Sequence, residues 1–187
     1  SDVRITKRLL QRMLSEVVAE TFNCMSIDND VSTNDSVIML ANGCAGNRPI
    51  NKKDAQYQKV KNHLTSVCRE LATQLVRDGE GTGRTCAISI QGARSKTQAR
   101  MAAGVIADSM LFKTALAGGD PNWGRVIAAI GSQPDIACNF NTIDVSCDTI
   151  KLVSNGRVMP FNKQKARSIF RRKVVPLRVN LKSGKAA

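Results

Sequence analysis

One carboxylate in this chain lies in a setting that suits ligand binding. Glu80 is flanked by glycines in the stretch Asp78-Gly79-Glu80-Gly81-Thr82-Gly83-Arg84. Flanking glycines let the backbone approach a ligand and leave the carboxylate accessible, so an ammonium group would be a suitable partner. The residue types alone favour an ordinary exposed loop glutamate over a binding residue. A phosphate-binding loop is excluded, because such loops follow a strand and open a helix, whereas this stretch follows a predicted helix.

The sole tryptophan lies in a second distinctive stretch, Asp120-Pro121-Asn122-Trp123-Gly124-Arg125, directly after Gly118-Gly119. Glycine accepts the left-handed conformation that ends many helices, so the glycine pair predicts a helix end. Asp120 and Pro121 suit the N-cap and the first position of a following helix. We therefore expect a corner between two helices, with Asp120 as the cap and Trp123 in the core.

The polar turn from Asp28 to Asp35 opens like a calcium-binding loop, with oxygen-bearing side chains at alternate positions. Loops of the EF-hand type need glycine at the sixth position and glutamate at the twelfth, where this chain has Thr33 and Met39. The calcium interpretation therefore fails. Hydrogen bonds from Asn and Asp side chains back to the turn backbone explain these residues.

The sequence lacks the residues for a histidine-based catalytic centre or a metal site. His63 is the only histidine and lies within a predicted helix, so no Ser-His-Asp or Cys-His arrangement can be assembled around it. We also expect no metal site, because the cysteines are scattered without Cys-x-x-Cys spacing. Reduced and mostly buried thiols of an intracellular protein fit them better than a disulfide framework. The six cysteines are Cys24, Cys44, Cys68, Cys86, Cys138 and Cys147.

The net charge of +13 makes nucleic-acid binding the main rival function. The densest basic clusters are Lys52-Lys53 and Arg171-Arg172-Lys173, but basic residues are spread along the chain without interleaved aromatic residues. We therefore expect solvated basic faces and no nucleic-acid site, and the charge also suits anionic substrates or an acidic partner chain. No apolar run is long enough to span a bilayer, so we expect a soluble chain and no membrane partner.

Apolar periodicity predicts helices alternating with short strands. The sequence therefore predicts an α/β or α+β layered protein, with a domain boundary near Gly83. A type I′ hairpin turn is expected at Asn155-Gly156. The expected helices span residues 5–22, 52–77 with Asn51 as cap, 96–116, and 163–170 with Asn162 as cap, and the expected strands span residues 24–27, 36–41, 85–90, 144–147, 150–153 and 175–181.

Three segments resemble the ornithine acetyltransferase family, the bifunctional glutamate N-acetyltransferases of arginine biosynthesis. They agree with it in order and spacing along nearly the whole chain. The matching segments are Phe22-Asn23 through Asp28 to Ser32-Thr33-Asn34-Asp35-Ser36, Asp78-Gly79-Glu80-Gly81, and Asp120 to Arg125 with the following Val126-Ile127-Ala128-Ala129-Ile130-Gly131.

The resemblance implies a function. Family members cut themselves, and the new N-terminal threonine of the second chain takes an acetyl group from N-acetylornithine and passes it to glutamate in a ping-pong reaction. The matching glutamate binds substrate, so the resemblance gives that role to Glu80; no other residue of the chain is a site residue by this reasoning. Family members usually follow this turn with Ala-Thr-Lys, where this chain has Thr82-Gly83-Arg84. Asn34 and Asp35 are expected to hold loops beside the active site.

The resemblance further identifies the chain as the second (beta) chain of a precursor. It implies a self-cleaving, N-terminal-nucleophile-like sandwich in which residues 1–83 share a catalytic layer with the first (alpha) chain, and residues 84–187 form a smaller C-terminal α+β domain. The family's Thr-Met-Leu start is expected before Ser1 and its closing segment after Ala187, while the oxyanion hole belongs to the first chain. No residue here is then the catalytic nucleophile.

The expected partners are the first chain, N-acetylornithine and glutamate, in an assembly of two alpha and two beta chains. No cofactor is expected, and acetyl-CoA remains open as a second acetyl donor. The cytoplasm is the expected compartment, with the mitochondrial matrix or a plastid as alternatives. Two other functions stay open: a self-cleaving aminopeptidase-like relative, and a terminal nucleophile at Ser1 itself.

Overall fold

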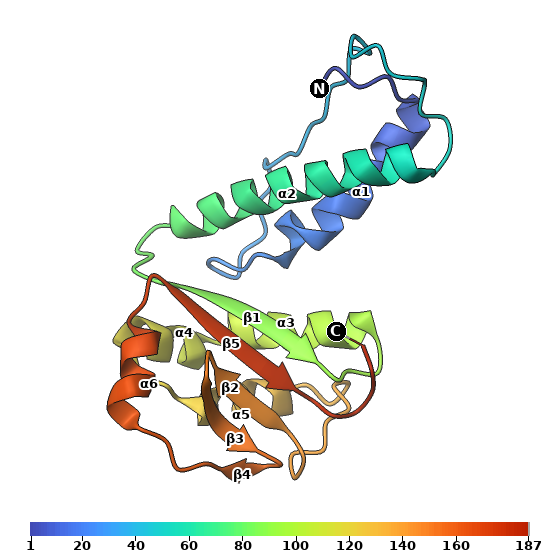
Figure 1. Cartoon of the computed structure of the whole chain (residues 1–187). Helices are drawn as coiled ribbons and strands as arrows, with labels where there is room; N and C mark the ends of the chain where they lie inside the picture. The colour runs from blue at the N-terminus through green and yellow to red at the C-terminus, as the bar shows by residue number, and fades with distance from the viewer. Residues whose placement is uncertain (187) are drawn as a thin grey trace. The chain divides into compact units, whose positions relative to one another are not determined.

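The computed structural model describes residues 1–186 and divides them into two compact units (Figure 1). The first unit contains Ser1–Met25 and Asp30–Asp78. The second contains Ser26–Asn29 and the chain from Gly79 onward. The assignment of residues 1–83 to a layer shared with another chain stays a prediction.

The first unit is built on two helices, α1 (Lys7–Glu20) and α2 (Ala55–Arg77), with a short 3₁₀ turn η1 (Phe22–Cys24) after α1. The apolar residues of α1 recur every four positions, and this buries Leu9, Met13 and Val17 against α2. The helix predicted from the periodicity of residues 5–22 is thus confirmed. Tyr57 and Cys68 of α2 complete the buried cluster.

The cap predicted for α2 is wrong by three residues. Asp54, and not Asn51, is the N-cap, because its carboxylate accepts a hydrogen bond from the backbone N–H of Tyr57 at 3.0 Å. Both residue types make good caps, so local preference did not separate them. Burial of Tyr57 fixes the start of the helix at the later position.

Two predicted strands, residues 24–27 and 36–41, are not strands in this structure. Phe22–Cys24 forms the 3₁₀ turn, and the 36–41 segment pairs with no strand among residues 1–186. The apolar pattern is present, but a strand exists only where a neighbour accepts its hydrogen bonds. Ile38 and Leu40 are consequently 79% and 77% exposed.

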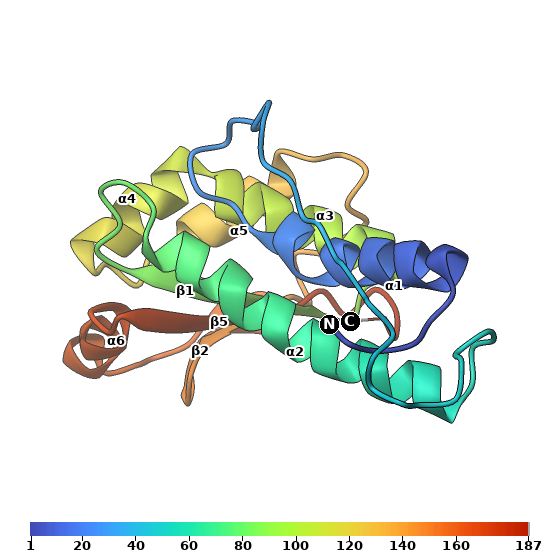
Figure 2. The same cartoon turned by 90° about the horizontal axis from the view of Figure 1, so that it is seen from above.

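The second unit contains a five-stranded sheet in the order β1-β5-β2-β3-β4. The strands β1 and β5 are parallel, and the other neighbours are antiparallel. Helices cover one face of the sheet (Figure 2), and α6 (Lys163–Phe170) connects β4 to β5. The strands are β1 (Thr85–Gln91), β2 (Asp144–Cys147), β3 (Ile150–Ser154), β4 (Arg157–Val158) and β5 (Val174–Asn180).

Local sequence signals placed this sheet well. Residues Asn155 and Gly156 both have positive φ and connect β3 to β4, as expected for a type I′ turn. Alternating residues of β2 and β5, such as Val145, Leu177 and Val179, are fully or almost fully buried under the helices. The predicted mixed α/β architecture is confirmed.

The helix expected over residues 96–116 is broken into α3 (Lys96–Asp108) and α4 (Met110–Gly118). Ser109 adopts an extended conformation, and its hydroxyl oxygen caps α4 by accepting a hydrogen bond from the N–H of Phe112 at 3.2 Å. Serine competes in this way with helix continuation, which periodicity alone did not reveal. Within residues 1–186 no single helix is long and apolar enough to span a membrane; α3 and α4 meet that test only together, bent by 62°.

Candidate functional site

The short helix α4 is where the segments that carry candidate functional residues meet in the second unit. The last turn of α4 leads into the Asp120–Arg125 corner, and two further segments, Ser26–Asn29 and the Glu80 turn, are tied to it by side-chain hydrogen bonds. The residues joined by these hydrogen bonds lie 32 and 86 residues apart in sequence. Their convergence makes this helix the centre of the candidate site.

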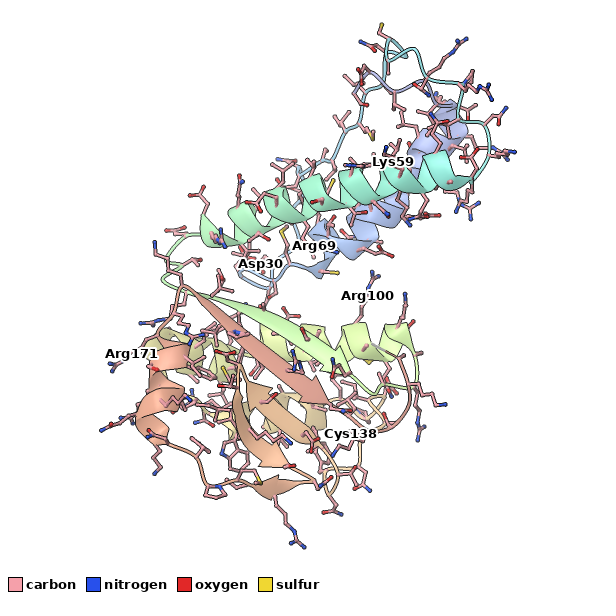
Figure 3. The ribbon with its side chains drawn as sticks, viewed as in Figure 1. Asp30, Lys59, Arg69, Arg100, Cys138 and Arg171 are labelled. Atoms are coloured by element: carbon pink, nitrogen blue, oxygen red, sulfur yellow. The ribbon has the colours of Figure 1, made fainter. Side chains whose placement is uncertain are left out.

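The corner begins with the helix end that the glycine pair predicts. Gly119 has φ 66° and closes a Schellman motif, in which Asp120 N donates to Ala115 O at 2.8 Å and Gly119 N donates to Leu116 O at 3.1 Å. Arg171, which Figure 3 labels at the end of α6, packs its aliphatic stem close to Gly119. The corner is thus fixed by both its backbone and its surroundings.

The predicted cap of the following helix is wrong by two residues. Asn122 caps α5 (Trp123–Gly131) by accepting a hydrogen bond from the N–H of Arg125 at 3.2 Å. Asp120 is occupied differently, since its N–H closes α4 and its carboxylate accepts a hydrogen bond from Asn122 Nδ2 at 3.1 Å. Asp120 therefore orients the cap and is not the cap itself. Trp123 is half-buried and packs against the main core.

The arginine that ends the Asp120–Arg125 motif holds the corner onto α4. Arg125 Nη1 donates to Leu111 O at 2.6 Å and to Thr114 Oγ1 at 2.8 Å. Through Arg125 the motif is hydrogen-bonded to the helix that precedes it, so this arginine fixes the corner against α4.

The Glu80 turn is attached to the C-terminal end of the same helix, where the corner begins. Thr82 N donates to Gly79 O at 3.0 Å, and Gly81 has φ 71°, so a tight turn presents the Glu80 side chain. Arg84, directly before β1, donates through Nη1 to Ala117 O and, at 3.5 Å, to Leu116 O. The structure thereby brings the Glu80 turn and the Asp120 corner to one end of α4.

The Glu80 carboxylate is exposed and makes no hydrogen bond or ion pair within residues 1–186. The carboxylates of Glu16, Asp144 and Asp148, in contrast, all form ion pairs with Lys or Arg side chains. A free carboxylate beside the capped end of a helix can bind an ammonium group.

The third segment, Ser26–Asn29, is held at the junction of α3 and α4. Lys113 Nζ donates to Ile27 O at 2.8 Å and to the side-chain oxygen of Asn29. Asp108 accepts from Ser26 Oγ at 2.6 Å, and its backbone oxygen accepts from Asn29 Nδ2 at 2.8 Å. These contacts anchor the start of the polar turn on α4.

Sequence reasoning did not single out Arg84, Asp108 or Lys113. Lys113 carried a usable signal, because it is the only charged residue between Ser109 and Gly119 in an apolar helix. Arg84 and Asp108 carried none, since charged residues next to a loop are ordinarily solvated.

The loop-holding role expected for Asn34 and Asp35 stays a prediction. The hydroxyl of Ser32 accepts hydrogen bonds from the backbone N–H groups of Asn34 and Asp35 at 3.2 and 3.0 Å. Their side chains make no hydrogen bond within the described part of the chain.

The remaining titratable side chains offer no second centre in residues 1–186. His63 is exposed on α2, with Nδ1 2.8 Å from Lys59 O. Burial raises the pKa of Cys86 and of Cys147 to about 12, so both thiols stay protonated and unreactive. The described residues contain no group of three or more His, Cys, Asp or Glu that could hold a metal ion.

Comparison with known proteins gives one consistent result. The family model described as "ArgJ family" matches residues 1–187. The chain is similar to the "Arginine biosynthesis bifunctional protein ArgJ" of Bacillus cereus strain ATCC 14579, with 36% identity over 98% of this chain and 45% of the relative. It is also similar to the protein of that name from Staphylococcus epidermidis, with 34% identity over 98% of this chain and 46% of the relative. The chain thus spans about half the length of these relatives.

A solved structure agrees along the whole fold. The crystal structure of the arginine biosynthesis bifunctional protein argJ from Bacillus halodurans superposes with a TM-score of 0.95 at 34% sequence identity, covering 99% of this chain and 87% of the solved chain. A family match over every residue, together with this superposition, leaves one assignment: the chain belongs to the ArgJ family.

Proposed function

We propose that the chain is the second-chain part of an enzyme that transfers an acetyl group from N-acetylornithine to glutamate in arginine biosynthesis. The observation that carries the proposal is the family match over residues 1–187 with relatives named as bifunctional arginine-biosynthesis proteins. The hydrogen-bonded arrangement around α4 supports it, because the exposed Glu80 carboxylate of the attached turn makes no hydrogen bond or ion pair within residues 1–186.

The proposed reaction has two balanced steps. A threonine hydroxyl outside residues 1–187 attacks the acetyl carbonyl of N-acetylornithine, and ornithine leaves with its α-amino group restored by a proton. The amino group of glutamate then attacks the acyl ester, and N-acetylglutamate leaves while the threonine hydroxyl is regenerated. Glu80 binds the ammonium group at the far end of the N-acetylornithine side chain, which orients the acetyl group toward the nucleophile. Acetyl-CoA as a second donor fits the word "bifunctional" in the names of the relatives.

The proposed partner is the first chain of the same precursor, in an assembly of two first and two second chains located in the cytoplasm. The length of the relatives supports a missing portion of this kind, since the chain spans 45% of the Bacillus cereus protein. The first chain would supply the oxyanion hole and share the active site.

The test is Glu80→Gln in the enzyme produced from the complete gene. Losing one charge-assisted contact to an ammonium group costs about 1.5–3 kcal/mol, so kcat/KM for N-acetylornithine should fall by roughly 10- to 100-fold. The control is Glu70→Gln, which removes an exposed carboxylate on α2 that accepts a hydrogen bond from the side chain of Gln74. Equal activity of the two variants would remove Glu80 from the site, and absence of acetyl transfer by the unsubstituted enzyme would refute the function itself.

A further inference from the structure

The chain contains two Asn-Gly dipeptides, Asn42-Gly43 and Asn155-Gly156. Asparagine before glycine is prone to spontaneous loss of its side-chain amide, because glycine has no Cβ to block the approach of its backbone nitrogen to the preceding side chain. Both asparagines are exposed, and both glycines have positive φ, 79° at Gly43 and 70° at Gly156. Exposure and local sequence therefore do not distinguish the two sites.

The reaction needs a free backbone nitrogen and a polarised amide carbonyl. The glycine nitrogen gives up its proton to a solvent base and bonds to Cγ of the asparagine. The bond from Cγ to Nδ2 breaks, and the amide nitrogen takes a proton from solvent and leaves as ammonia. Water then opens the cyclic imide at either carbonyl, which yields aspartate or isoaspartate. A hydrogen bond from the glycine N–H opposes the first step, whereas a donor to Oδ1 favours it by stabilising the negative charge that develops there.

The Asn42-Gly43 dipeptide has both features. The N–H of Gly43 makes no hydrogen bond within residues 1–186. The backbone N–H of Cys44 donates to Asn42 Oδ1 at 3.0 Å and so polarises the carbonyl that would be attacked. Neither residue of the dipeptide belongs to a helix or strand. Movement of Gly43 N toward Cγ therefore breaks no helix and no strand pairing.

The Asn155-Gly156 dipeptide has only one of them. Lys182 Nζ donates to Asn155 Oδ1 at 2.6 Å, so this amide carbonyl is polarised as well. The N–H of Gly156, however, donates to Ile143 O at 2.9 Å, and the turn connects the paired strands β3 and β4. Gly156 N must leave Ile143 O before it can attack. The nucleophile, and not the carbonyl, separates the two sites.

We propose that Asn42 is a site of spontaneous deamidation in this protein, whereas the fold protects Asn155. The surroundings of Asn42 suit the charged product. The side chain of Arg4 lies beside Gly43, with Arg4 Cγ 3.7 Å from a Cβ built on the glycine. The Arg4 guanidinium makes no hydrogen bond or ion pair within the described part of the chain, so it can pair with a new carboxylate. The reaction does not depend on the proposed function.

The test is a time course at mildly alkaline pH on the protein expressed from the complete gene. Peptides produced by digestion at acid pH are assigned by mass spectrometry, with fragmentation that separates aspartate from isoaspartate. Asn42 should convert at least about tenfold faster than Asn155, which corresponds to a difference of about 1.4 kcal/mol in the barrier. Asn42→Gln is the assignment control, since its longer side chain forms the cyclic imide much more slowly.

The same protein in denaturant is the matched control, because both dipeptides then lose their tertiary contacts. The two conversion rates should there agree within about twofold. Equal rates in the folded protein, faster conversion of Asn155, or no conversion at either site would refute the proposal. A preference for Asn42 that persists in denaturant would also overturn it, since flanking residues and not the fold would then set the rates. Acetyl transfer plays no part in this readout, so failure of the proposed function is recognised separately.

Discussion

Replacing Arg84 by alanine should weaken both the end of α4 and the binding of substrate by Glu80. Arg84 Nη1 bonds to Ala117 O and Leu116 O, and this is the attachment of the Glu80 turn to α4. Leu116 O retains the bond from Gly119 N at 3.1 Å, so Ala117 O is the acceptor left without a protein donor in residues 1–186. The turn then keeps its local bond but loses its anchor.

The magnitude follows from these contacts. A charge-assisted hydrogen bond is worth about 1.5–3 kcal/mol, but the exposed Ala117 carbonyl regains water and the 3.5 Å contact is weak, so we expect a loss of about 1 kcal/mol. For a protein of this size that lowers Tm by roughly 2–4 °C. A turn that samples other positions should raise KM for N-acetylornithine by about fivefold, with a smaller change in kcat.

The assay is steady-state kinetics and thermal denaturation of the complete enzyme with Arg84→Ala and Arg84→Lys. Lysine can still donate to Ala117 O, although from a single point, so Arg84→Lys should recover at least half of both losses. A fall in Tm with an unchanged KM would show that Arg84 is structural and does not position Glu80. An unchanged Tm would refute the idea that the Arg84 hydrogen bonds stabilise the end of α4. If KM rises in Glu80→Gln but not in the Arg84 variants, the role proposed for Glu80 still stands.

Two further predictions concern stability. Gly119→Ala forces a Cβ into a left-handed backbone and to within 3.0 Å of Arg171 Cγ, so it should cost about 1–2 kcal/mol in chemical denaturation; Gly118→Ala, where a Cβ meets nothing within 4 Å, should be close to neutral, and equal costs would contradict the capping assignment. Ion pairs, led by Lys53 at 2.6 Å and joined by Lys61 at 2.8 Å, hold the pKa of Glu16 at about 2 against an ordinary 4.5. Because the pKa of Glu16 is lower in the folded than in the unfolded protein, its ionised carboxylate stabilises the fold at pH values above the unfolded pKa. Glu16→Gln should therefore lower the free energy of unfolding by about 1–2 kcal/mol at pH 7, after allowance for solvent screening. The difference from the unsubstituted protein should shrink as pH falls from about 5 towards 2, and a difference independent of pH would refute the ion-pair explanation.

Much of the fold could be read from local signals. The left-handed Gly119, the Asn155-Gly156 turn and the alternating strand β5 were all predicted, because a glycine dihedral or a two-residue alternation depends on neighbours in sequence. The family and the role proposed for Glu80 came from the exact residues of the three motifs that resemble the family. The residue types around Glu80 alone favoured an ordinary loop glutamate.

Where two residues of equal capping ability compete, the sequence did not decide between them. Asp54 replaced Asn51, and Asn122 replaced Asp120, because packing of Tyr57 and closure of α4 fixed the helix starts. The break at Ser109 belongs to the same class, since a serine can either continue a helix or cap the next one.

The sequence by itself thus determined the secondary-structure elements with strong local signals, the layered fold class and the family. Only the tertiary structure decided that α4 joins the three motif segments, through Lys113, Arg84 and Arg125. Only the tertiary structure showed that the apolar residues Val37, Ile38 and Met39 make no hydrogen bond within residues 1–186. The physical reason is the same in both cases: long-range hydrogen bonds depend on which distant segments meet, and no local pattern encodes that meeting.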